Sequence, residues 1–134
     1  MKAIKIFIGY DRTTRIPAYT LAESILENSS IPVAFQFLHR GSLSQIFTRD
    51  FGPYDSTEFS NSRFLVPYLS NYEGYSLFID NDMIVTADVA ELLTYIDENK
   101  TLMCVKHNHI VKKGKKFLGM PQSGYSFKNW TSVM

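Results

Sequence analysis

Two aspartates that follow a short apolar run are the residues of this sequence most suited to chemistry. Asp80 and Asp82 flank Asn81 directly after the run Leu77–Ile79. Two carboxylates at this spacing suit a hard divalent cation such as Mg²⁺ or Mn²⁺, which prefers oxygen ligands and commonly shares them with substrate phosphates. The same residues also suit a solvated turn, because Asn and Asp are common in turns. The apolar strand before the pair and the matching features upstream favour the metal interpretation.

The apolar run before Asp80 is typical of a strand that is buried on both faces. Alternating and apolar residues predict a first strand over Ala3–Gly9, and helical spacing predicts a helix from Pro17 to about Asn28. A second strand is expected over Pro32–Leu38. Strand, helix and strand in this order predict an α/β fold with a mostly parallel central sheet flanked by helices. Ligands of such sheets bind at the carboxyl ends of the strands.

The middle of the chain is patterned more weakly. His39–Thr57 is rich in Gly, Ser and Asp, and we expect a loop there with a helical turn around Leu43–Phe47. Phe59–Leu69 has roughly helical spacing, but Pro67 interrupts it. We therefore predict a short or kinked helix over this segment.

Three further elements are expected after the two aspartates. Asp88 is placed to cap a helix over Val89–Ile96, whose apolar face comprises Leu92, Leu93 and Ile96. A strand is expected over Thr101–Val105, and Lys128–Met134 is expected to be the beginning of one more strand. Together the predictions describe residues 1–134 as a single domain.

A basic stretch precedes the last expected strand. Ile110–Met120 contains four lysines around Gly114, which predicts a hairpin with a basic tip. The tip suits contact with phosphates or an anionic surface, and it equally suits solvation.

Composition narrows the class of protein. The 134 residues are 45% hydrophobic and 20% charged, as in ordinary globular proteins, and the net charge of +1 gives no reason to expect nucleic acid as a partner. A single cysteine, Cys104, excludes an internal disulfide and favours a reducing compartment, so we expect a cytoplasmic protein. The sequence contains no apolar run of transmembrane length, and its first residues do not form a signal peptide.

The end of the first expected strand carries Gly9, Tyr10 and Asp11. In a parallel sheet this end can lie beside the end of the strand that precedes Asp80. Gly9 would let a planar base approach the backbone, Tyr10 would stack on that base, and Asp11 would accept a hydrogen bond from the base or ribose. Tyr10 equally suits packing, and Asp11 equally suits capping of the following helix.

Two arginines complete the predicted site. Arg63 lies 17 positions before Asp80, and Arg15 lies near the start of the first helix. A guanidinium group pairs well with phosphate oxygens, so both arginines are candidates for binding phosphates. Arg15 also suits a solvated position on the helix surface.

Three segments resemble a known family. Their sequences are Ile-Phe-Ile-Gly-Tyr-Asp, Phe-Ser-Asn-Ser-Arg-Phe-Leu-Val-Pro-Tyr-Leu and Leu-Phe-Ile-Asp-Asn-Asp-Met-Ile-Val. In this order they resemble nucleotide-sugar-dependent glycosyltransferases of the GT-A fold. They are most similar to the retaining group that includes glycogenin and the bacterial lipopolysaccharide galactosyltransferases. The resemblance covers about residues 3 to 106, and its specific part is the Asp-x-Asp (DXD) strand with an upstream arginine.

This resemblance implies a Rossmann-like nucleotide-diphospho-sugar transferase fold and transfer of a hexose from a UDP-sugar to a glycan, lipid or protein acceptor. It implies that Asp80 and Asp82 bind Mn²⁺ or Mg²⁺, that Asn81 lies near the ribose or donor sugar, and that Arg63 contacts the donor. Family members continue past this length with an acceptor pocket and a histidine metal ligand, which neither His107 nor His109 matches. We therefore expect a C-terminally truncated, donor-binding part, with oligomerisation covering exposed strand edges. The alternatives are a catalytically silent nucleotide-binding module and an interaction domain of the same fold.

Overall fold

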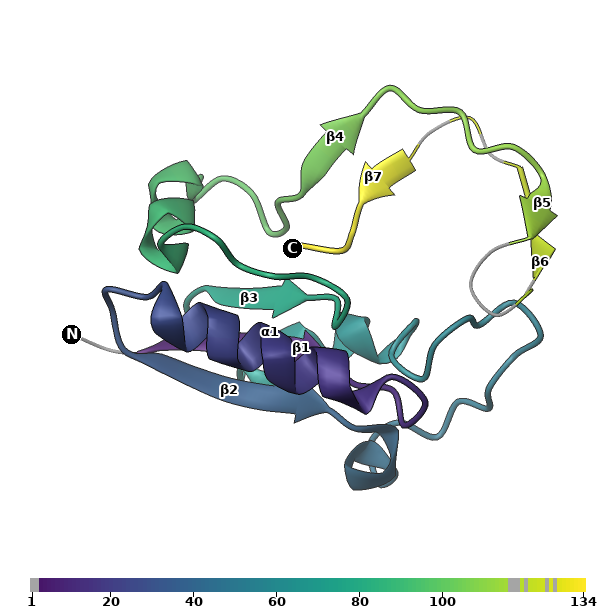
Figure 1. Ribbon diagram of the computed structural model, residues 1–134, viewed down its shortest axis with the longest axis horizontal. Helices are drawn as coiled ribbons and strands as arrows, with labels where there is room; N and C mark the ends of the chain where they lie inside the picture. Colours follow the sequence, from purple (N-terminus) through teal and green to yellow (C-terminus); the bar gives the residue numbers. More distant parts are fainter. Residues whose placement is uncertain (1–2, 116–118, 120, 125, 127) are drawn as a thin grey trace.

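A three-stranded parallel sheet forms the centre of the protein. A computed structural model describes residues 3–115, 119, 121–124, 126 and 128–134, and it places β1 (Ile4–Gly9) between β2 (Val33–Leu38) and β3 (Ser76–Ile79) (Figure 1). The strands pair in register, with Ile8 opposite both Phe37 and Ile79. The predicted α/β fold with a parallel sheet is therefore confirmed, and all three predicted strands of that sheet are present.

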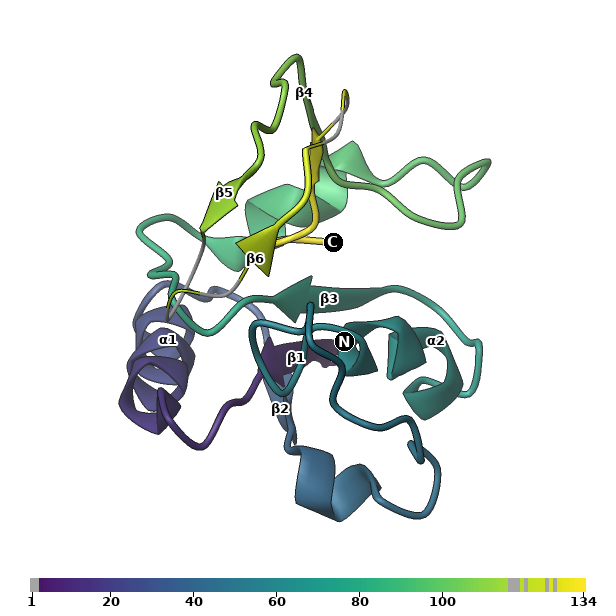
Figure 2. The same ribbon diagram turned by 90° about the vertical axis from the view of Figure 1, so that its right-hand side faces the viewer.

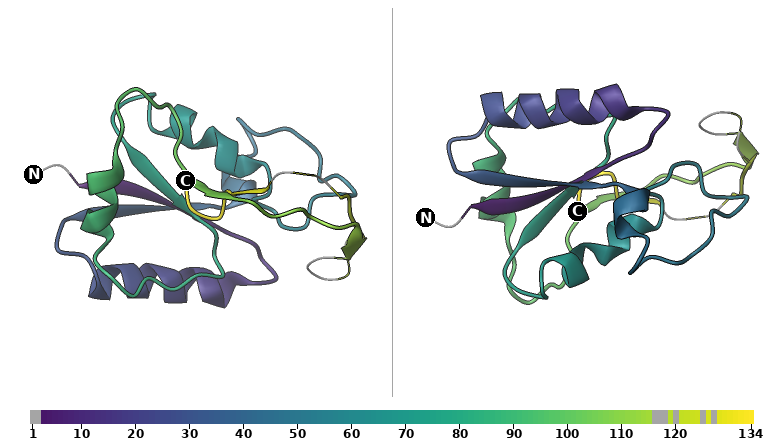
Figure 3. Two further views of the ribbon diagram at one scale, coloured as in Figure 1. Left: turned by 90° about the horizontal axis from the view of Figure 1, so that it is seen from above. Right: turned by 90° about the horizontal axis from the view of Figure 1, so that it is seen from below.

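Helices cover both faces of the sheet (Figure 3). α1 (Arg15–Glu27) lies on one face and buries Ala18, Leu21 and Ile25, which recur at helical spacing. The other face is covered by three short elements: the 3₁₀ helices η1 (Arg40–Leu43) and η2 (Ser62–Leu65), and α2 (Val66–Leu69). Among the described residues, none of the helices has the length and apolar character needed to cross a membrane.

The alternation of side chains along β1 explains why this strand is buried throughout. Ile6 and Ile8 pack toward α1, whereas Phe7, between them, packs toward the opposite face. Phe7 joins Phe59 and Phe78 in that second cluster. The two clusters make the sheet a layer between two hydrophobic cores, as expected for parallel strands.

The segment around Pro67 is broken into two turns, as predicted. η2 ends at Leu65, and α2 then begins with Pro67 in its first turn, where the missing N–H group costs little. A turn connects α2 to β3, and Asn71 and Tyr72 adopt left-handed conformations there, with φ of 57° and 56°. The helical turn expected around Leu43–Phe47 is present directly after η1, because the Phe47 N–H group donates to the Leu43 carbonyl at 2.8 Å.

The helix predicted over Val89–Ile96 differs from expectation. It is a 3₁₀ helix, η3 (Val89–Tyr95), and only Val89 reaches the core, while Leu92 and Leu93 are 41% and 38% exposed. Three residues per turn place different side chains on the inner face than an α-helix does. The predicted cap is present, since the Asp88 side chain accepts a hydrogen bond from the Ala90 N–H group.

The described residues between 105 and 130 form a ribbon, here called the arm, that projects from the body (Figures 1 and 2). β4 (Val105–His107) pairs antiparallel with β7 (Lys128–Trp130), and β5 (Gly114–Lys115) pairs antiparallel with β6 (Pro121–Gln122). The strand that was expected over Thr101–Val105 instead begins at Val105 and forms β4, because its pairing partner β7 lies beside Val105–His107. Gly114 belongs to a strand, not the hairpin tip, and the predicted tip residues Lys116, Phe117 and Met120 lie outside the described residues.

The last residues return from the arm to the sheet. Phe78 and Met134 exchange backbone hydrogen bonds of 2.8 and 3.0 Å, and the Asp80 N–H group donates to the Ser132 carbonyl at 2.8 Å. This segment runs antiparallel to β3. It covers the edge of β3 with backbone partners that the strand would otherwise lack.

Candidate functional site

The carboxyl ends of β1 and β3 bring the two predicted groups of polar residues to one edge. Ile8 of β1 pairs with Ile79 of β3. The residues that follow them, Gly9 and Asp80, therefore lie side by side where the two strands end. The expectation that these two strand ends are neighbours is confirmed. This edge is where α/β sheets bind ligands.

A buried ion pair lies at the end of β3. Arg63 Nη1 is 3.1 Å from Asp80 Oδ1, and the two side chains are 11% and 18% exposed. The same nitrogen donates to the Thr131 carbonyl at 3.0 Å, and the guanidinium lies over the rings of Phe59 and Phe78. Arg63 is therefore held by partners within the protein, and its predicted contact with the donor stays a prediction.

Burial and charge act against each other in this pair. Burial raises the pKa of Asp80 above its ordinary value, although Arg63 opposes the shift. Burial likewise lowers the pKa of Arg63, although Asp80 and Asp82 oppose that shift. Despite the ion pair, Asp80 Oδ1 and Arg63 Nε are buried without a directed hydrogen bond to the residues that the structure describes. The ion pair is thus fixed in position, and Asp80 Oδ1 and Arg63 Nε could each still take part in a hydrogen bond.

The arrangement fits a divalent cation that takes only part of its ligands from the protein. Asp80 Oδ1 is out of contact with solvent, so the residual exposure of this side chain lies on its other atoms. Asp82 is exposed two residues further on. Within the described part of the chain, no cluster of three or more His, Cys, Asp or Glu side chains could hold a metal ion. A cation here would complete its shell with water and phosphate oxygens, as Mg²⁺ commonly does.

Asn81 points inward and fixes the turn between the two aspartates. It is 4% exposed, and its Nδ2 group donates to both the carbonyl and the hydroxyl of Thr14 at 3.0 Å. These bonds tie the end of β3 to the start of α1. Its amide donors serve the protein itself, so the predicted proximity to a ribose or sugar stays a prediction.

Gly9 and Tyr10, at the end of β1, pack against aromatic side chains of the protein itself. The ring of Phe59 fills the space beside Gly9, where an added Cβ atom would meet it at 2.6 Å. A base could therefore not approach Gly9 from the side of Phe59, and its predicted approach to this backbone stays a prediction. Tyr10 makes edge-to-face contacts with Tyr19, Phe37 and His39, and its predicted stacking on a base stays a prediction.

Asp11 organises the loop that follows β1. One carboxylate oxygen accepts hydrogen bonds from the backbone and hydroxyl of Thr13, and the other accepts one from the Glu58 N–H group at 2.9 Å. Burial acts to raise the pKa of Asp11, but these hydrogen bonds outweigh it and hold the pKa below its ordinary value. Asp11 thus caps its own turn, while Thr14 stands at the N-cap of α1.

A hollow of about 570 Å³ opens beside Asp11. The ion pair between Arg12 and Glu58, 2.7 Å apart, forms one wall, and Arg40 and Phe51 contribute to the others. Arg40 and Phe51 come from the long loop after β2, which showed no pattern by which sequence reasoning could select them. The length of the loop was the one available signal, since long loops are often functional.

The remaining predicted residues lie nearby or elsewhere. Arg15 is exposed in the first turn of α1. His107 and His109 are exposed in the arm, where His107 packs against Trp130. A second hollow of about 420 Å³ lies against Arg63 and is bounded by Tyr75, Lys100, Leu102 and Met134, among others.

Comparisons with known proteins give one curated relative. The chain is 38% identical over 135 residues to a protein named Protein CDI from Arabidopsis thaliana. The match covers 99% of this chain and 52% of that protein, so the chain spans about half the length of the curated relative it matches. None of the searched models of known protein families matches the chain. A search of solved structures also finds no match.

Proposed function

We propose that this chain is the nucleotide-sugar-binding part of a metal-dependent glycosyltransferase with a GT-A-like fold. The observation that carries the proposal is the pair of carboxylates at the end of β3, with Asp80 held by Arg63 and Asp82 exposed beside it. The hollow beside Asp11, at the same edge of the sheet, has the position expected of a nucleoside pocket.

In this proposal two aspartates hold the metal ion, and two further residues position them. Asp82 and the outward part of Asp80 would hold Mn²⁺ or Mg²⁺. The bound ion would neutralise the negative charge of the diphosphate as it leaves the sugar. Arg63 fixes the orientation of Asp80, and Asn81 fixes the turn that connects the two aspartates.

The remaining residues would bind the donor. Arg12, whose side chain is 71% exposed although it pairs with Glu58, and Arg15 would contact phosphate oxygens at this edge. Phe51, half exposed at the hollow, offers a ring face for a base. The donor we propose is a UDP-hexose. The acceptor class, a cytoplasmic location and assembly into a homo-oligomer are further parts of the proposal that only the resemblance and the composition support.

Titration calorimetry with UDP tests the proposal. We expect Mn²⁺ to raise the affinity of the chain for UDP relative to the same titration with a chelator. Asp82→Asn should reduce the Mn²⁺-dependent gain by about tenfold or more, in the range known for altered metal sites. Asp82 is the better target than Asp80, because it is exposed and its replacement leaves no buried arginine unpaired.

The matched control is Glu98→Gln, which neutralises another exposed carboxylate. It should leave the effect of Mn²⁺ unchanged. UDP binding that is equal with Mn²⁺ and with chelator, and unchanged in Asp82→Asn, would contradict the proposal and favour an interaction domain.

A second candidate is a catalytically silent nucleotide-binding module. It is favoured by the closed network at this edge, in which Arg63 pairs with Asp80 and both oxygens of Asp11 accept internal hydrogen bonds. Hydrolysis of UDP-hexoses separates the two candidates. Mn²⁺-dependent UDP binding without release of hexose would identify the silent module.

A further inference from the structure

Charge is divided unevenly along the chain, although the net charge is only +1. All 13 acidic residues lie at or before Glu98, whereas half of the 14 lysines and arginines lie after it. The segment from Asn99 to Met134 therefore contains only cationic and neutral side chains. A segment of one sign attracts partners of the opposite sign over about a Debye length.

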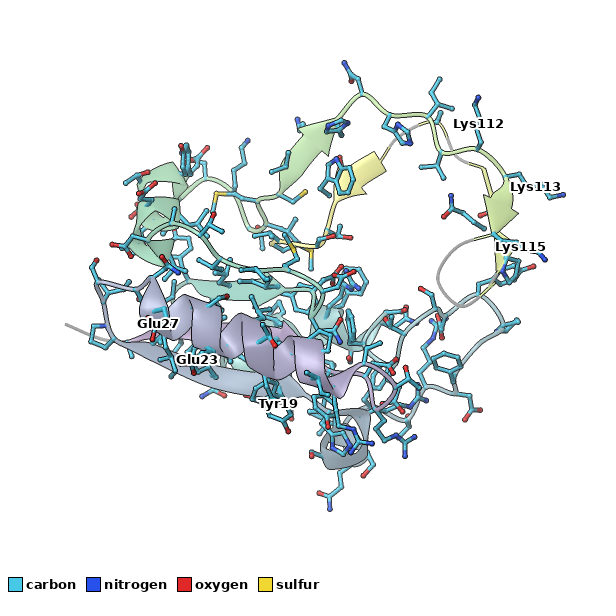
Figure 4. All side chains as sticks on the ribbon, viewed as in Figure 1. Tyr19, Glu23, Glu27, Lys112, Lys113 and Lys115 are labelled. Carbon is cyan, nitrogen blue, oxygen red and sulfur yellow. The ribbon has the colours of Figure 1, made fainter. Side chains whose placement is uncertain are left out.

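The structure places much of this positive charge on the arm. Lys112, Lys113 and Lys115 are exposed, and Figure 4 shows them pointing away from the body at the far end of the ribbon. The exposed acidic side chains of α1, Glu23 and Glu27, lie on the body, away from these lysines (Figure 4). The molecule thus presents opposite charges at two separate places.

Apolar side chains are exposed on the same arm. Ile110 is 70% exposed and lies two residues before Lys112, and Val105 is 61% exposed next to Lys106. Val111, by contrast, is buried, so the ribbon directs some of its aliphatic side chains inward and leaves others in solvent. Lysines and exposed aliphatic residues on one ribbon can contact lipid phosphates and the acyl boundary together, as the two faces of an interfacial helix do.

We propose that the arm binds the surface of an anionic bilayer, with its lysines on lipid phosphates and Ile110 at the acyl boundary. A nucleic acid would satisfy the lysines but would offer nothing to the exposed aliphatic residues. A second copy of the chain could offer Glu23 and Glu27, but exposed ion pairs contribute little individually. A bilayer satisfies both features, and its anionic surface repels the acidic face of α1, which orients the protein.

Co-sedimentation of the full chain with vesicles, without nucleotide, tests this inference. We expect binding to vesicles that contain phosphatidylserine, weaker binding at high salt, and no binding to phosphatidylcholine alone. Each lysine near an anionic surface is worth about fivefold in affinity, so the triple variant Lys112→Gln/Lys113→Gln/Lys115→Gln should bind about a hundredfold more weakly. The inference does not depend on the proposed transferase function, since no nucleotide is present.

Single variants supply a matched comparison. Lys113→Gln should weaken binding about fivefold, whereas Arg49→Gln, which removes an exposed cation from the body, should change it by less than about twofold. Ile110→Ser should weaken the binding that persists at high salt. Circular dichroism verifies that the variants are folded.

Three results would overturn the inference. The first is equal binding of the triple variant and the wild type, or equal binding to both kinds of vesicle. The second is self-association at low salt without vesicles that disappears in Glu23→Gln/Glu27→Gln, which would assign the lysines to a second copy. The third is tighter binding to a short nucleic-acid duplex than to phosphatidylserine vesicles.

Discussion

The carboxyl edge of the sheet and the arm are organised in opposite ways. At the edge, the central ion pair is largely shielded from solvent, and Arg63 is fixed by Asp80, Thr131 and two aromatic rings. In the arm, lysines and aliphatic side chains extend into solvent from two-stranded ribbons. Both ion pairs between described side chains belong to the body.

This contrast separates two uses of charge. A buried charge is tolerated in the fold only together with its partner. The packing of the core then fixes the position of both groups. An exposed charge contributes little to folding and remains available to a partner. Substitutions at the edge should therefore change stability strongly, whereas substitutions in the arm should change binding alone.

The largest effect is expected for Arg63→Met, because it leaves the buried Asp80 carboxylate unpaired. We expect a loss of about 3 kcal/mol in the free energy of unfolding, measured by urea denaturation. Arg49→Met, at an exposed position of the body, should change it by less than about 0.5 kcal/mol. In Arg63→Met/Asp80→Asn both charges are absent, so the double variant should recover much of the loss. A double variant as unstable as the sum of the two single variants would contradict the coupling.

Asp11→Asn should have the next largest effect, and its effect should depend on pH. The pKa of Asp11 lies below its ordinary value of 3.8, so the ionised form favours the folded state. This stabilisation is complete above the ordinary value and is lost as the pH falls through the lowered pKa of the folded state. At neutral pH, Asp11→Asn should cost about 2 kcal/mol, since charged hydrogen bonds are lost. The difference from the wild type should shrink in acid, as measured by denaturation across pH; a constant difference would contradict this.

Asn81→Ala removes the two hydrogen bonds that hold the turn to Thr14. We expect a loss of about 1.5 kcal/mol in the free energy of unfolding. Asn81→Asp should cost more, because it places a third negative charge between two aspartates. Asn99→Ala, in an exposed turn, is the matched control and should be nearly neutral. Equal stability of Asn81→Ala and wild type would show that the turn does not need this anchor.

The smallest effect on folding is expected in the arm. Ile110→Ser should change the free energy of unfolding by less than about 0.5 kcal/mol, because this side chain is 70% exposed. Limited proteolysis should cut the arm before the body, since thin ribbons open more easily than packed sheets. A cut within the β1–α1 unit that precedes any cut in the arm would contradict the contrast between the regions.

Elements whose signals are local were predicted well. The spacing of Ala18, Leu21 and Ile25 identified α1, the apolar run before Asp80 identified β3, and Pro67 identified the break between η2 and α2. Each of these features depends on residues within a turn or a strand. The order of neighbouring residues in the sequence was therefore sufficient to predict these three elements.

Features that depend on distant residues were missed. Phe59 fills the space beside Gly9, and Thr131 binds Arg63 across 68 positions in sequence, so neither contact leaves a local signal. Leu92 and Leu93 were expected in the core, but η3 forms as a 3₁₀ helix whose inner face contains other residues. The basic stretch of the arm was predicted, by contrast, because its lysines are neighbours in the sequence.

The return of residues 131–134 to the sheet links these two regions mechanically. The Thr131 carbonyl accepts a hydrogen bond from Arg63, and the Ser132 carbonyl accepts one from the Asp80 backbone. The strand that leaves the arm therefore touches both members of the buried ion pair within two residues. Two hydrogen bonds therefore connect the end of the arm directly to Arg63 and Asp80. The exchange rate of the Asp80 amide hydrogen would report whether the arm is docked or pulled away.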